Sequence, residues 1–376
     1  MISNFKAIIY LLISSVFLTA CKTQESVNNP DDQNTKADIS WEETKVINKV
    51  PVLNYSGDFL QGPDLDTHSG QGSQYGRMLK LNNITWLAVY IISNNYGYRI
   101  EEDGGYMLEI AKSGDKGNTW KPISMIEDEG RYLDNGQMIL LSNGTIILAC
   151  RSVKWKESYL LTVYKSSDNG LSWTRNSIID SNEGSPGELG NPDKGICEPH
   201  LLILDNGKLA VMYANEKHVI DAVSCSQIIS EKISEDFGES WGNEIWAVNK
   251  EGKNSSRTGM PVWSKMKNDK YILFYEICDP EECNIYYKIS DDGLTWPSRH
   301  GIQLPNQSGT PYVLSMDEGF ILVVTSDKGN FSTSIDFGNT WYLTQCAWQH
   351  TSSFIEDWAQ TISSSIYEIE PEKISI

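Results

Sequence analysis

Short apolar runs recur along the chain in pairs, and a few polar residues separate the two runs of each pair. The five pairs read "MLKLNNITWLAVY", "MILLSNGTIILAC", "LLILDNGKLAVMY", "WSKMKNDKYILFY" and "VLSMDEGFILVV". Asn-Gly and similar dipeptides between apolar runs are a strong signal for a β-hairpin. Because no segment shows the helical period, the pattern predicts an all-β protein built from hairpins.

A second motif lies downstream of the hairpins. An octapeptide of the form Ser-x-Asp-x-Gly-x-Ser/Thr-Trp follows an alternating, strand-like run. Its copies are "SGDKGNTW" (113–120), "SSDNGLSW" (166–173), "SEDFGESW" (234–241), "SIDFGNTW" (334–341) and a fifth, "ISDDGLTW" (289–296), with Ile289 in the serine position. The copies recur about every fifty residues, a spacing typical of repeat folds.

The octapeptide has the chemistry of a turn between antiparallel strands. Its Asp can accept hydrogen bonds from the turn backbone, its Gly can adopt a positive φ, and its Trp can pack sideways. One repeat is therefore a hairpin, a strand, the octapeptide and a last strand, which together make a four-stranded antiparallel blade. Five blades, with strand-like segments left over at 41–56 and 346–370, predict a six-bladed β-propeller in which both chain ends form the sixth blade.

Composition and charge fit this fold and exclude some partners. The chain has 376 residues, of which 40% are hydrophobic, so a sizeable core can form. Its formal net charge of −19 repels nucleic acids and other polyanions. The many tryptophans and tyrosines suit sheet packing and sugar recognition. We therefore expect a neutral ligand and no nucleic-acid partner.

The N-terminal segment predicts export. "MISNFKAIIYLLISSVFLTAC" has one lysine, an apolar run and small residues before Cys21, a pattern typical of a signal peptide rather than a membrane span. Leu-Thr-Ala-Cys resembles a bacterial lipobox, which implies cleavage before Cys21 and lipid attachment to its sulfur; the alternative is an ordinary signal peptide with a chance cysteine. Residues 22–40 are polar and predict a flexible tether to a domain at 41–376. We expect a bacterial lipoprotein of the outer membrane, cell surface or periplasm.

The remaining cysteines can oxidise in an exported protein. Cys278 and Cys283 are close enough in sequence to close a small loop, whereas the other pairings cannot be deduced. The cysteines show no zinc-site spacing and the five histidines do not cluster. We therefore expect neither a metal ion nor a cofactor.

Charged residues lie a strand length from the hairpin turns. In a propeller, the start of the first strand and the end of the second both lie near the axis, at the face opposite the turn. The charged residues at these places are Arg77, Asp134, Glu198 and Arg257 before the turns, and Arg151 and Glu276 after them. Such charges are costly to bury unless they are paired. Their equivalent positions predict one shared site, and two carboxylates suit glycoside hydrolysis.

Two resemblances refine these expectations. The octapeptides resemble the Asp boxes (bacterial neuraminidase repeats) of the sialidase-like superfamily. "YGRMLKLNN", "YLDNGQMILLSNGTIILACRS", "CEPHLLILDNGKLAVMY" and "SRTGMPVWSKMKNDKYILFYE" resemble, in the same order, glycoside hydrolase family 93, the exo-α-1,5-L-arabinanases. This resemblance implies that Glu198 is the acid/base and Glu276 the nucleophile. The substrate-site residues that it implies are Arg77, Asp134, Asn135, Arg151, His200 and Arg257.

The resemblances also raise two finer points. Sialidase-like enzymes use a tyrosine in the mouth of the propeller, and Tyr312 of "GTPYVL" is the candidate for a catalytic tyrosine here. The tryptophan that often precedes the Glu-Pro pair in family 93 is Cys197 in this chain. The resemblance therefore does not define the sugar that the site accepts.

Two other functions remain open. An exo-α-sialidase grips the substrate carboxylate with three arginines, two of them usually after the catalytic glutamate, but only Arg299 follows Glu276 here. The usual Phe/Tyr-Arg-Ile-Pro opening is also absent around Arg77. The second alternative is a non-catalytic surface lipoprotein that binds glycans, because one fold can support either role. We rank hydrolysis of an arabinan-like oligo- or polysaccharide above both.

Overall fold

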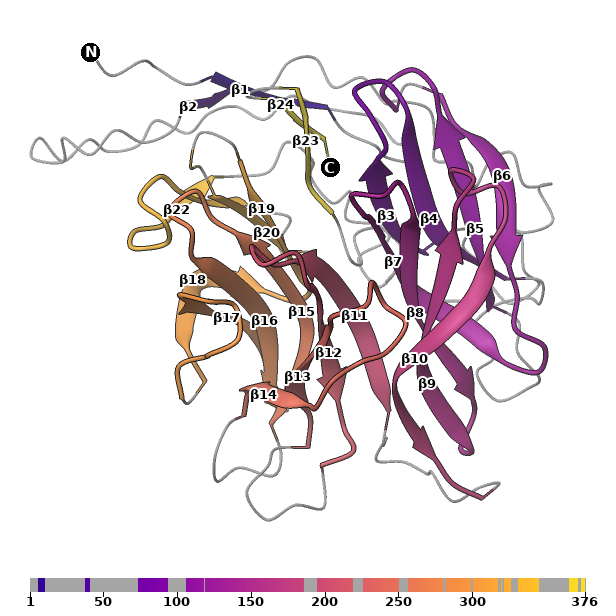
Figure 1. Cartoon of the computed structure of the whole chain (residues 1–376). Helices are drawn as coiled ribbons and strands as arrows, with labels where there is room; N and C mark the ends of the chain where they lie inside the picture. The colour runs from indigo at the N-terminus through magenta and orange to yellow at the C-terminus, as the bar shows by residue number, and fades with distance from the viewer. Residues whose placement is uncertain are drawn as a thin grey trace, which may run out of the picture.

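The computed structural model consists of strands, turns and loops. It describes residues 6–10, 38–40, 74–93, 106–117, 119–185, 195–218, 226–249, 256–279, 282–298, 300–316, 319, 321–325, 331–344, 365–370 and 373–375. Within these ranges the strands assemble into six four-stranded sheets (Figure 1). No helix in this part of the chain has the length and apolar character needed to cross a bilayer. The prediction of an all-β fold made of four-stranded sheets is confirmed.

The first three sheets follow the chain order and are antiparallel. The first contains β3 (Gln74–Lys80), β4 (Trp86–Ser93), β5 (Tyr106–Ser113) and β6 (Lys121–Ile126). The second contains β7 (Tyr132–Leu140), β8 (Ile146–Lys154), β9 (Ser158–Ser166) and β10 (Thr174–Glu183). The third contains β11 (Ile196–Ile203), β12 (Leu209–Asn215), β13 (Ile228–Ser234) and β14 (Ile245–Val248).

The fourth and fifth sheets repeat this arrangement. The fourth contains β15 (Arg257–Lys265), β16 (Tyr271–Asp279), β17 (Glu282–Ser290) and β18 (Ile302–Ser308). The fifth contains β19 (Pro311–Ser315), β20 (Ile321–Thr325), β21 (Phe331–Ser334) and β22 (Tyr342–Thr344). In all five sheets the first two strands are the hairpin predicted from the paired apolar runs.

The sixth sheet joins the two ends of the chain, but it is not the antiparallel blade that the sequence predicted. Its strands, in spatial order, are β2 (Asp38–Ser40), β1 (Lys6–Tyr10), β24 (Lys373–Ser375) and β23 (Tyr367–Glu370). β1 runs parallel to both β2 and β24, and only β23 and β24 pair antiparallel. β1 lies within the predicted signal peptide and β2 within the predicted tether, while the expected segment 41–56 is outside the described residues.

The octapeptides form turns between the third and fourth strands of the five antiparallel sheets. In "SEDFGESW", the Ser234 hydroxyl donates to Asp236 Oδ1 (2.7 Å) and accepts from the Gly238 amide (2.7 Å). Asp236 Oδ1 also accepts from the Ser240 amide (2.8 Å), and Gly238 has a φ of 87°. The copies at 113–120, 166–173 and 334–341 repeat these bonds. The serine, the aspartate and the glycine therefore fix the turn together.

The copy at 289–296 departs from the predicted alignment. Ser290, rather than Ile289, donates to Asp292 Oδ1 (3.0 Å) and accepts from the Gly293 amide (2.9 Å). This copy is one residue shorter, because Gly293 follows Asp292 directly. The serine position in this repeat is therefore Ser290, and the expectation that isoleucine replaces it was wrong.

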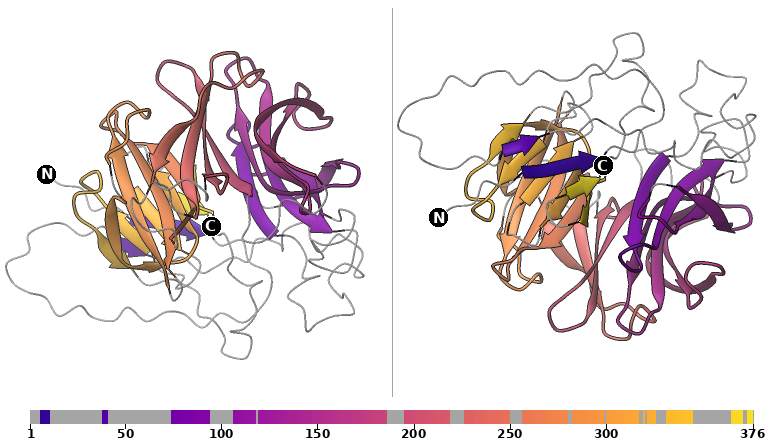
Figure 2. Two further views of the ribbon diagram at one scale, coloured as in Figure 1. Left: turned by 90° about the horizontal axis from the view of Figure 1, so that it is seen from below. Right: turned by 90° about the horizontal axis from the view of Figure 1, so that it is seen from above.

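The first strands of the sheets succeed one another around a common centre. β3 contacts β7, β7 contacts β11, β11 contacts β15 and β15 contacts β19. Tyr367 of β23 accepts a hydrogen bond from the Met78 amide of β3 (2.8 Å), and its hydroxyl lies 3.3 Å from that of Tyr312 in β19. Apolar side chains fill the space between neighbouring sheets, and one cluster runs from the first sheet to the third. The sheets accordingly fan out in the two views of Figure 2.

Candidate functional site

Four of the first strands carry the same β-bulge. The register shifts lie between Gln74 and Arg77, Asp134 and Gln137, Cys197 and His200, and Gly259 and Val262. Within each bulge one residue is left-handed: φ is 56° at Tyr75, 50° at Asn135, 60° at Glu198 and 52° at Met260. Glycine or proline follows each of these four residues. Bulges redirect side chains, and left-handed residues other than glycine concentrate at functional sites, so the four bulges mark the candidate site.

Five of the six predicted charged residues lie at or opposite these bulges, and Arg257 lies two residues before the fourth. Arg151 of β8 is paired with Asp134, and Glu276 of β16 is paired with Gly259. Both pairs directly precede the left-handed residue of their bulge. Arg151 in the second sheet and Glu276 in the fourth sheet therefore occupy equivalent positions. The repeat thus explains why residues far apart in the sequence converge.

Asp134 and Arg151 form a two-pronged ion pair. Arg151 Nε donates to Asp134 Oδ1 (2.7 Å) and Nη2 donates to Oδ2 (2.5 Å). Burial opposes the charge on the guanidinium, but Asp134 outweighs it and raises the pKa of Arg151 well above its ordinary value. The main role of Asp134 is therefore to hold Arg151 in place. A two-pronged ion pair is both strong and directional, so it fixes the orientation of the guanidinium group.

Glu198 is a half-buried carboxyl of the site. Its Oε2 accepts a hydrogen bond from the main-chain amide of Met260 in the neighbouring sheet. Burial raises the pKa of Glu198, while the Met260 amide and the guanidinium groups of Arg151 and Arg257 oppose the rise. A carboxyl group with a raised pKa can hold a proton and donate it to a ligand, which is the requirement for a general acid.

Glu198 and Glu276 reach the space over the same glycine. A methyl group built on Gly259 would lie 3.3 Å from Glu198 Oε2 and 3.6 Å from Glu276 Oε1. It would also lie 2.8 Å from Nε2 of Gln227, which is closer than real contacts of this kind. Glycine at this position therefore leaves the room in which two carboxylates and an amide meet.

Arg257 is held by two residues that the sequence analysis missed. Its Nη2 donates to Glu216 Oε1 (2.8 Å) and to Gln227 Oε1 (2.7 Å). Glu216 is buried and its other oxygen accepts from the Gly195 amide (2.9 Å). The sequence did carry a signal for Glu216, since it directly follows an apolar second strand, as the charged residues of the other repeats do. Gln227 carried none, because it lies in an isolated bridge beside Arg257.

Arg77 lies in an aromatic cluster with two of the other predicted residues. Its guanidinium carbon lies 4.0 Å from the ring centroid of Tyr75 and 5.1 Å from that of Tyr312. The Tyr312 ring meets His200 edge to face at 5.9 Å. Burial raises the pKa of Tyr75 to about 12, with Arg77 opposing and Glu198 adding to the rise. Tyr75, which the sequence analysis missed, thereby connects this cluster to Glu198.

His200 is a buried histidine, and neither of its ring nitrogens finds a hydrogen-bond partner among the described residues. Burial and the nearby Arg77 lower the pKa of His200 to about 3, so the imidazole is neutral. A neutral imidazole offers one donor and one acceptor, which matches a hydroxyl group. The environment of His200 therefore suits an uncharged ligand.

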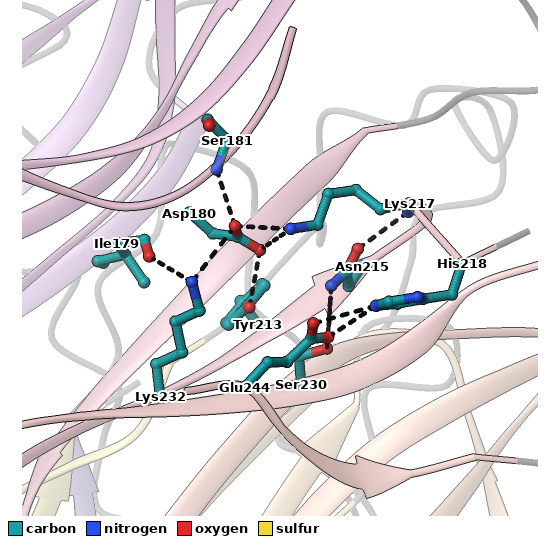
Figure 3. Close-up of polar contacts among 10 residues, drawn as sticks. All are labelled: Ile179, Asp180, Ser181, Tyr213, Asn215, Lys217, His218, Ser230, Lys232 and Glu244. Atoms are coloured by element: carbon teal, nitrogen blue, oxygen red, sulfur yellow. Dashed lines mark hydrogen bonds and ion pairs between the residues drawn. The ribbon is translucent and has the colours of Figure 1, made fainter. Parts of the chain in front are cut away.

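A polar network involves Asn215 and Lys217, the two residues next to Glu216 in the sequence (Figure 3). Asn215 Nδ2 donates to Glu244 Oε1 (2.8 Å), and Lys217 Nζ donates to Asp180 Oδ1 (2.6 Å). Asp180 also accepts from Tyr213 and Lys232 of the third sheet. The network anchors the chain on both sides of Glu216 and so fixes the carboxylate that orients Arg257.

Comparison with solved structures shows which fold this is. The chain is similar to the family 93 α-L-arabinofuranosidase of Fusarium graminearum in complex with arabinobiose (21% identity over 79% of this chain and 85% of that one, TM-score 0.60). It is also similar to an α-L-arabinanase of Penicillium chrysogenum in complex with arabinobiose (23%, 78% and 84%, TM-score 0.61). A protein of unknown function from Dyadobacter fermentans aligns with 14% identity over 79% and 87% of the two chains (TM-score 0.56).

Comparison by sequence identifies no relative. No family model matches the chain, and no curated protein matches it. The structural likeness therefore shows that the chain shares the fold of these two arabinan-active enzymes. The roles of Glu198, Glu276, Tyr312 and the substrate-site residues stay predictions.

Proposed function

We propose that this chain is an exo-acting glycoside hydrolase that cleaves a neutral glycan, arabinan in the first place, on a six-bladed β-propeller with five Asp-box turns. The observation that carries the proposal is the meeting of Glu198 and Glu276 over Gly259. The two distances from this glycine put their oxygens no more than about 7 Å apart, within the range of carboxyl pairs in glycosidases.

The roles of the two carboxyl groups follow from their surroundings. Glu198, whose pKa is raised by burial, donates its proton to the glycosidic oxygen as the bond breaks. Glu276 attacks the anomeric carbon, and Glu198 then takes a proton from the water that releases the sugar. Arg151 and Arg257 stabilise the carboxylate that Glu198 becomes, since both guanidinium groups lower its pKa.

The arginines favour a neutral substrate over a sialoside. Arg151 is engaged by Asp134, Arg257 by Glu216 and Gln227, and Arg77 by the Gly76 carbonyl and two tyrosine rings. A site that grips a carboxylate needs guanidinium donors aimed at the ligand. The neutral His200 supports the same conclusion, and so do the similar Fusarium and Penicillium structures, which are complexes with arabinobiose.

Activity assays separate the three candidate functions. Purified protein is offered linear arabinan and an α-sialyl reporter, with Glu198→Gln and Glu276→Gln as parallel samples. We expect arabinose-containing products from the wild type and a loss of rate of at least about 100-fold in both variants. Sialic acid release would overturn the ranking of substrates. Glycan binding that survives in both variants, with no hydrolysis by the wild type, would establish a binding protein instead.

The stereochemistry of the product tests the nucleophile. Because Glu276 is proposed to form a covalent intermediate, the reaction retains the configuration of the anomeric carbon. Proton NMR of the first product formed would show the retained anomer. Inversion would make Glu276 a general base and not a nucleophile.

We further propose that the protein is an exported lipoprotein with Cys21 as the lipidated residue and a propeller domain at 41–376. The support is the lipobox-like sequence and the polar stretch that follows it. Metabolic labelling with a radioactive fatty acid in a bacterial host should mark the wild type and leave Cys21→Ser unlabelled. Equal labelling of both would refute the anchor.

A further inference from the structure

We propose that Glu276, Cys278 and Cys283 form a zinc-binding site that opens when the disulfide between the two cysteines is reduced. Cys278 and Cys283 are directly opposite each other in the β16–β17 hairpin and are bonded to each other. One carboxylate oxygen of Glu276 and the two sulfur atoms all lie within 4.8 Å of one another. All three side chains are half-buried, so both a reductant and an ion can reach them.

The three atoms are close enough to share one tetrahedral zinc ion once the sulfur–sulfur bond is broken. Thiolate sulfur binds Zn²⁺ at about 2.3 Å, so two sulfurs on one tetrahedral ion lie about 3.8 Å apart. The observed separations, all below 4.8 Å, allow this arrangement once the sulfur–sulfur bond is broken. Two thiolates and one carboxylate leave a fourth position for water, as in open zinc sites. The ligand set favours a thiophilic ion over Mg²⁺ or Ca²⁺.

The redox step is a simple exchange. A dithiol supplies two electrons and two protons, the bond between Cys278 Sγ and Cys283 Sγ breaks, and the dithiol is itself oxidised to a disulfide. Zn²⁺ then replaces the two thiol protons, which pass to water. The hairpin pairing holds the two cysteines opposite each other before and after reduction, so the backbone need not move.

The two buried free thiols compete poorly for the same ion. Cys150 and Cys197 are both buried, and burial raises the pKa of each thiol well above its ordinary value. A thiol must lose its proton to bind zinc. The partly exposed pair in the β16–β17 hairpin is therefore the preferred cysteine site among the described residues.

The site was not expected from the sequence. Cys278 and Cys283 were identified as a loop-closing pair, and the third ligand, Glu276, comes from the alternation of β16, which places residues 276 and 278 on one face.

The zinc site also has a consequence for activity, which rests on the proposed function. Zinc on Glu276 occupies the proposed nucleophile, so a reduced, zinc-loaded enzyme is inactive while the oxidised enzyme is not.

Metal binding by the full chain tests the site without reference to activity. Oxidised protein, and protein reduced with an immobilised dithiol under nitrogen, are dialysed against Zn²⁺ and the bound metal is measured. We expect the reduced wild type to bind one more zinc per chain than the oxidised protein and than the reduced variant with Cys278→Ser and Cys283→Ser. Co²⁺ in place of Zn²⁺ should give thiolate charge-transfer absorption in the reduced wild type alone. Equal metal content in the three samples would overturn the proposal.

Two further measurements guard against misfolded variants and test the third ligand. In the wild type, zinc should protect Cys278 and Cys283 from iodoacetamide after reduction, as peptide mass spectrometry would show; alkylation that is unaffected by zinc contradicts the site. Glu276→Gln, which keeps both cysteines, should bind zinc at least tenfold more weakly, and unchanged affinity would remove the carboxylate from the site. Should zinc bind as expected while no form of the protein hydrolyses a glycan, the proposed function fails and the metal site stands.

Discussion

Glu198 accepts a hydrogen bond from the main-chain amide of Met260, and both residues are left-handed in equivalent bulges of neighbouring sheets. The bond fixes the carboxyl group across the boundary between the third and fourth sheets. It also favours the ionised form, while burial favours the protonated form and prevails. Two strained backbone positions thus set both the place and the proton affinity of the proposed acid.

The pH dependence of catalysis should follow from this setting. Glu198 must be protonated to act as an acid, so kcat/KM should fall as the pH rises through its raised pKa. Glu198→Gln should lower kcat/KM by about 100-fold or more and remove this limb of the profile. A substrate with a leaving group that needs no proton should recover part of the rate. A variant that keeps the wild-type pH profile would exclude Glu198 as the acid.

The same substitution should not destabilise the fold at neutral pH. The folded-state pKa of Glu198 is raised, so its contribution to stability is present below the ordinary glutamate pKa of 4.5 and is lost as the pH rises through the folded-state pKa. Glutamine can still accept from the Met260 amide and carries no charge to bury. Thermal unfolding at pH 7 should give a Tm for Glu198→Gln equal to or above that of the wild type.

A methyl group at position 259 should damage the site more than the fold. The added carbon of Gly259→Ala would lie 2.8 Å from Gln227 Nε2 and within 3.6 Å of both glutamates, so these side chains must move. We expect kcat/KM to fall by at least about tenfold, since small misplacements of reacting groups are costly. Gly114→Ala is the matched control, because nothing lies within 4 Å of its added carbon. Equal activity of both variants would show that Gly259 does not border the reacting groups.

Breaking the Asp134–Arg151 pair should lower both stability and activity. Asp134→Asn leaves the half-buried guanidinium of Arg151 without its countercharge, which should cost about 3 kcal/mol in the free energy of unfolding. The exposed pair Lys154–Glu157 in the same sheet is the control, and Glu157→Gln should cost less than about 1 kcal/mol. Urea unfolding of the two variants measures the difference. Similar costs would mean that solvent screens the Asp134–Arg151 pair as it does a surface pair.

The structural features that could be predicted from the sequence are those set by residues close together in the chain. The hairpins and the octapeptide turns were predicted because each is set by residues next to one another, such as Gly238, whose missing side chain permits a φ of 87°. Ser290 was misassigned because a one-residue deletion shifts the motif while leaving its tryptophan in place. The sixth sheet was predicted only in outline, because its strands pair across the whole length of the chain.

The same distinction separates the predicted from the missed site residues. Arg77, Glu198 and Glu276 stood out because a charge next to an apolar strand is unusual. Tyr75 and Met260 did not, since an aromatic or apolar residue in a strand is ordinary, and only the backbone reveals that they are left-handed. The Gly or Pro that follows each bulge residue could have indicated the bulges. It was overlooked because the surrounding residues fit an uninterrupted strand.

A buried glutamate away from the site should make stability depend on pH. Glu231 of β13 accepts from the Trp296 indole (2.8 Å), and burial raises its pKa to about 8. Its stabilising contribution is complete below the ordinary glutamate pKa of 4.5, declines as the pH rises toward about 8, and is lost above that. Glu231→Gln should flatten the decline in Tm across this window, whereas Glu235→Gln, at an exposed carboxylate, should not. Parallel curves for all three proteins would contradict the assignment.

The octapeptide turns should matter for stability and not for chemistry. Asp236→Ala removes the acceptor of the Ser240 amide and hydroxyl, so the turn between β13 and β14 should loosen. We expect a lower Tm and faster hydrogen exchange in this sheet, with kcat/KM per folded molecule close to that of the wild type. An unchanged Tm together with lost activity would assign the turn to the site.

The four bulges give the repeat a way to diversify. Each presents one side chain from the same backbone position, and these side chains are a phenol, an amide, a carboxyl and a thioether at Tyr75, Asn135, Glu198 and Met260. The strand pairing on either side is of the same kind, so a mutation at one of these positions changes the side chain that the bulge presents and spares the hydrogen bonds of the sheet. The bulges are therefore positions at which proteins of this fold can differ in side chain while their sheets stay the same.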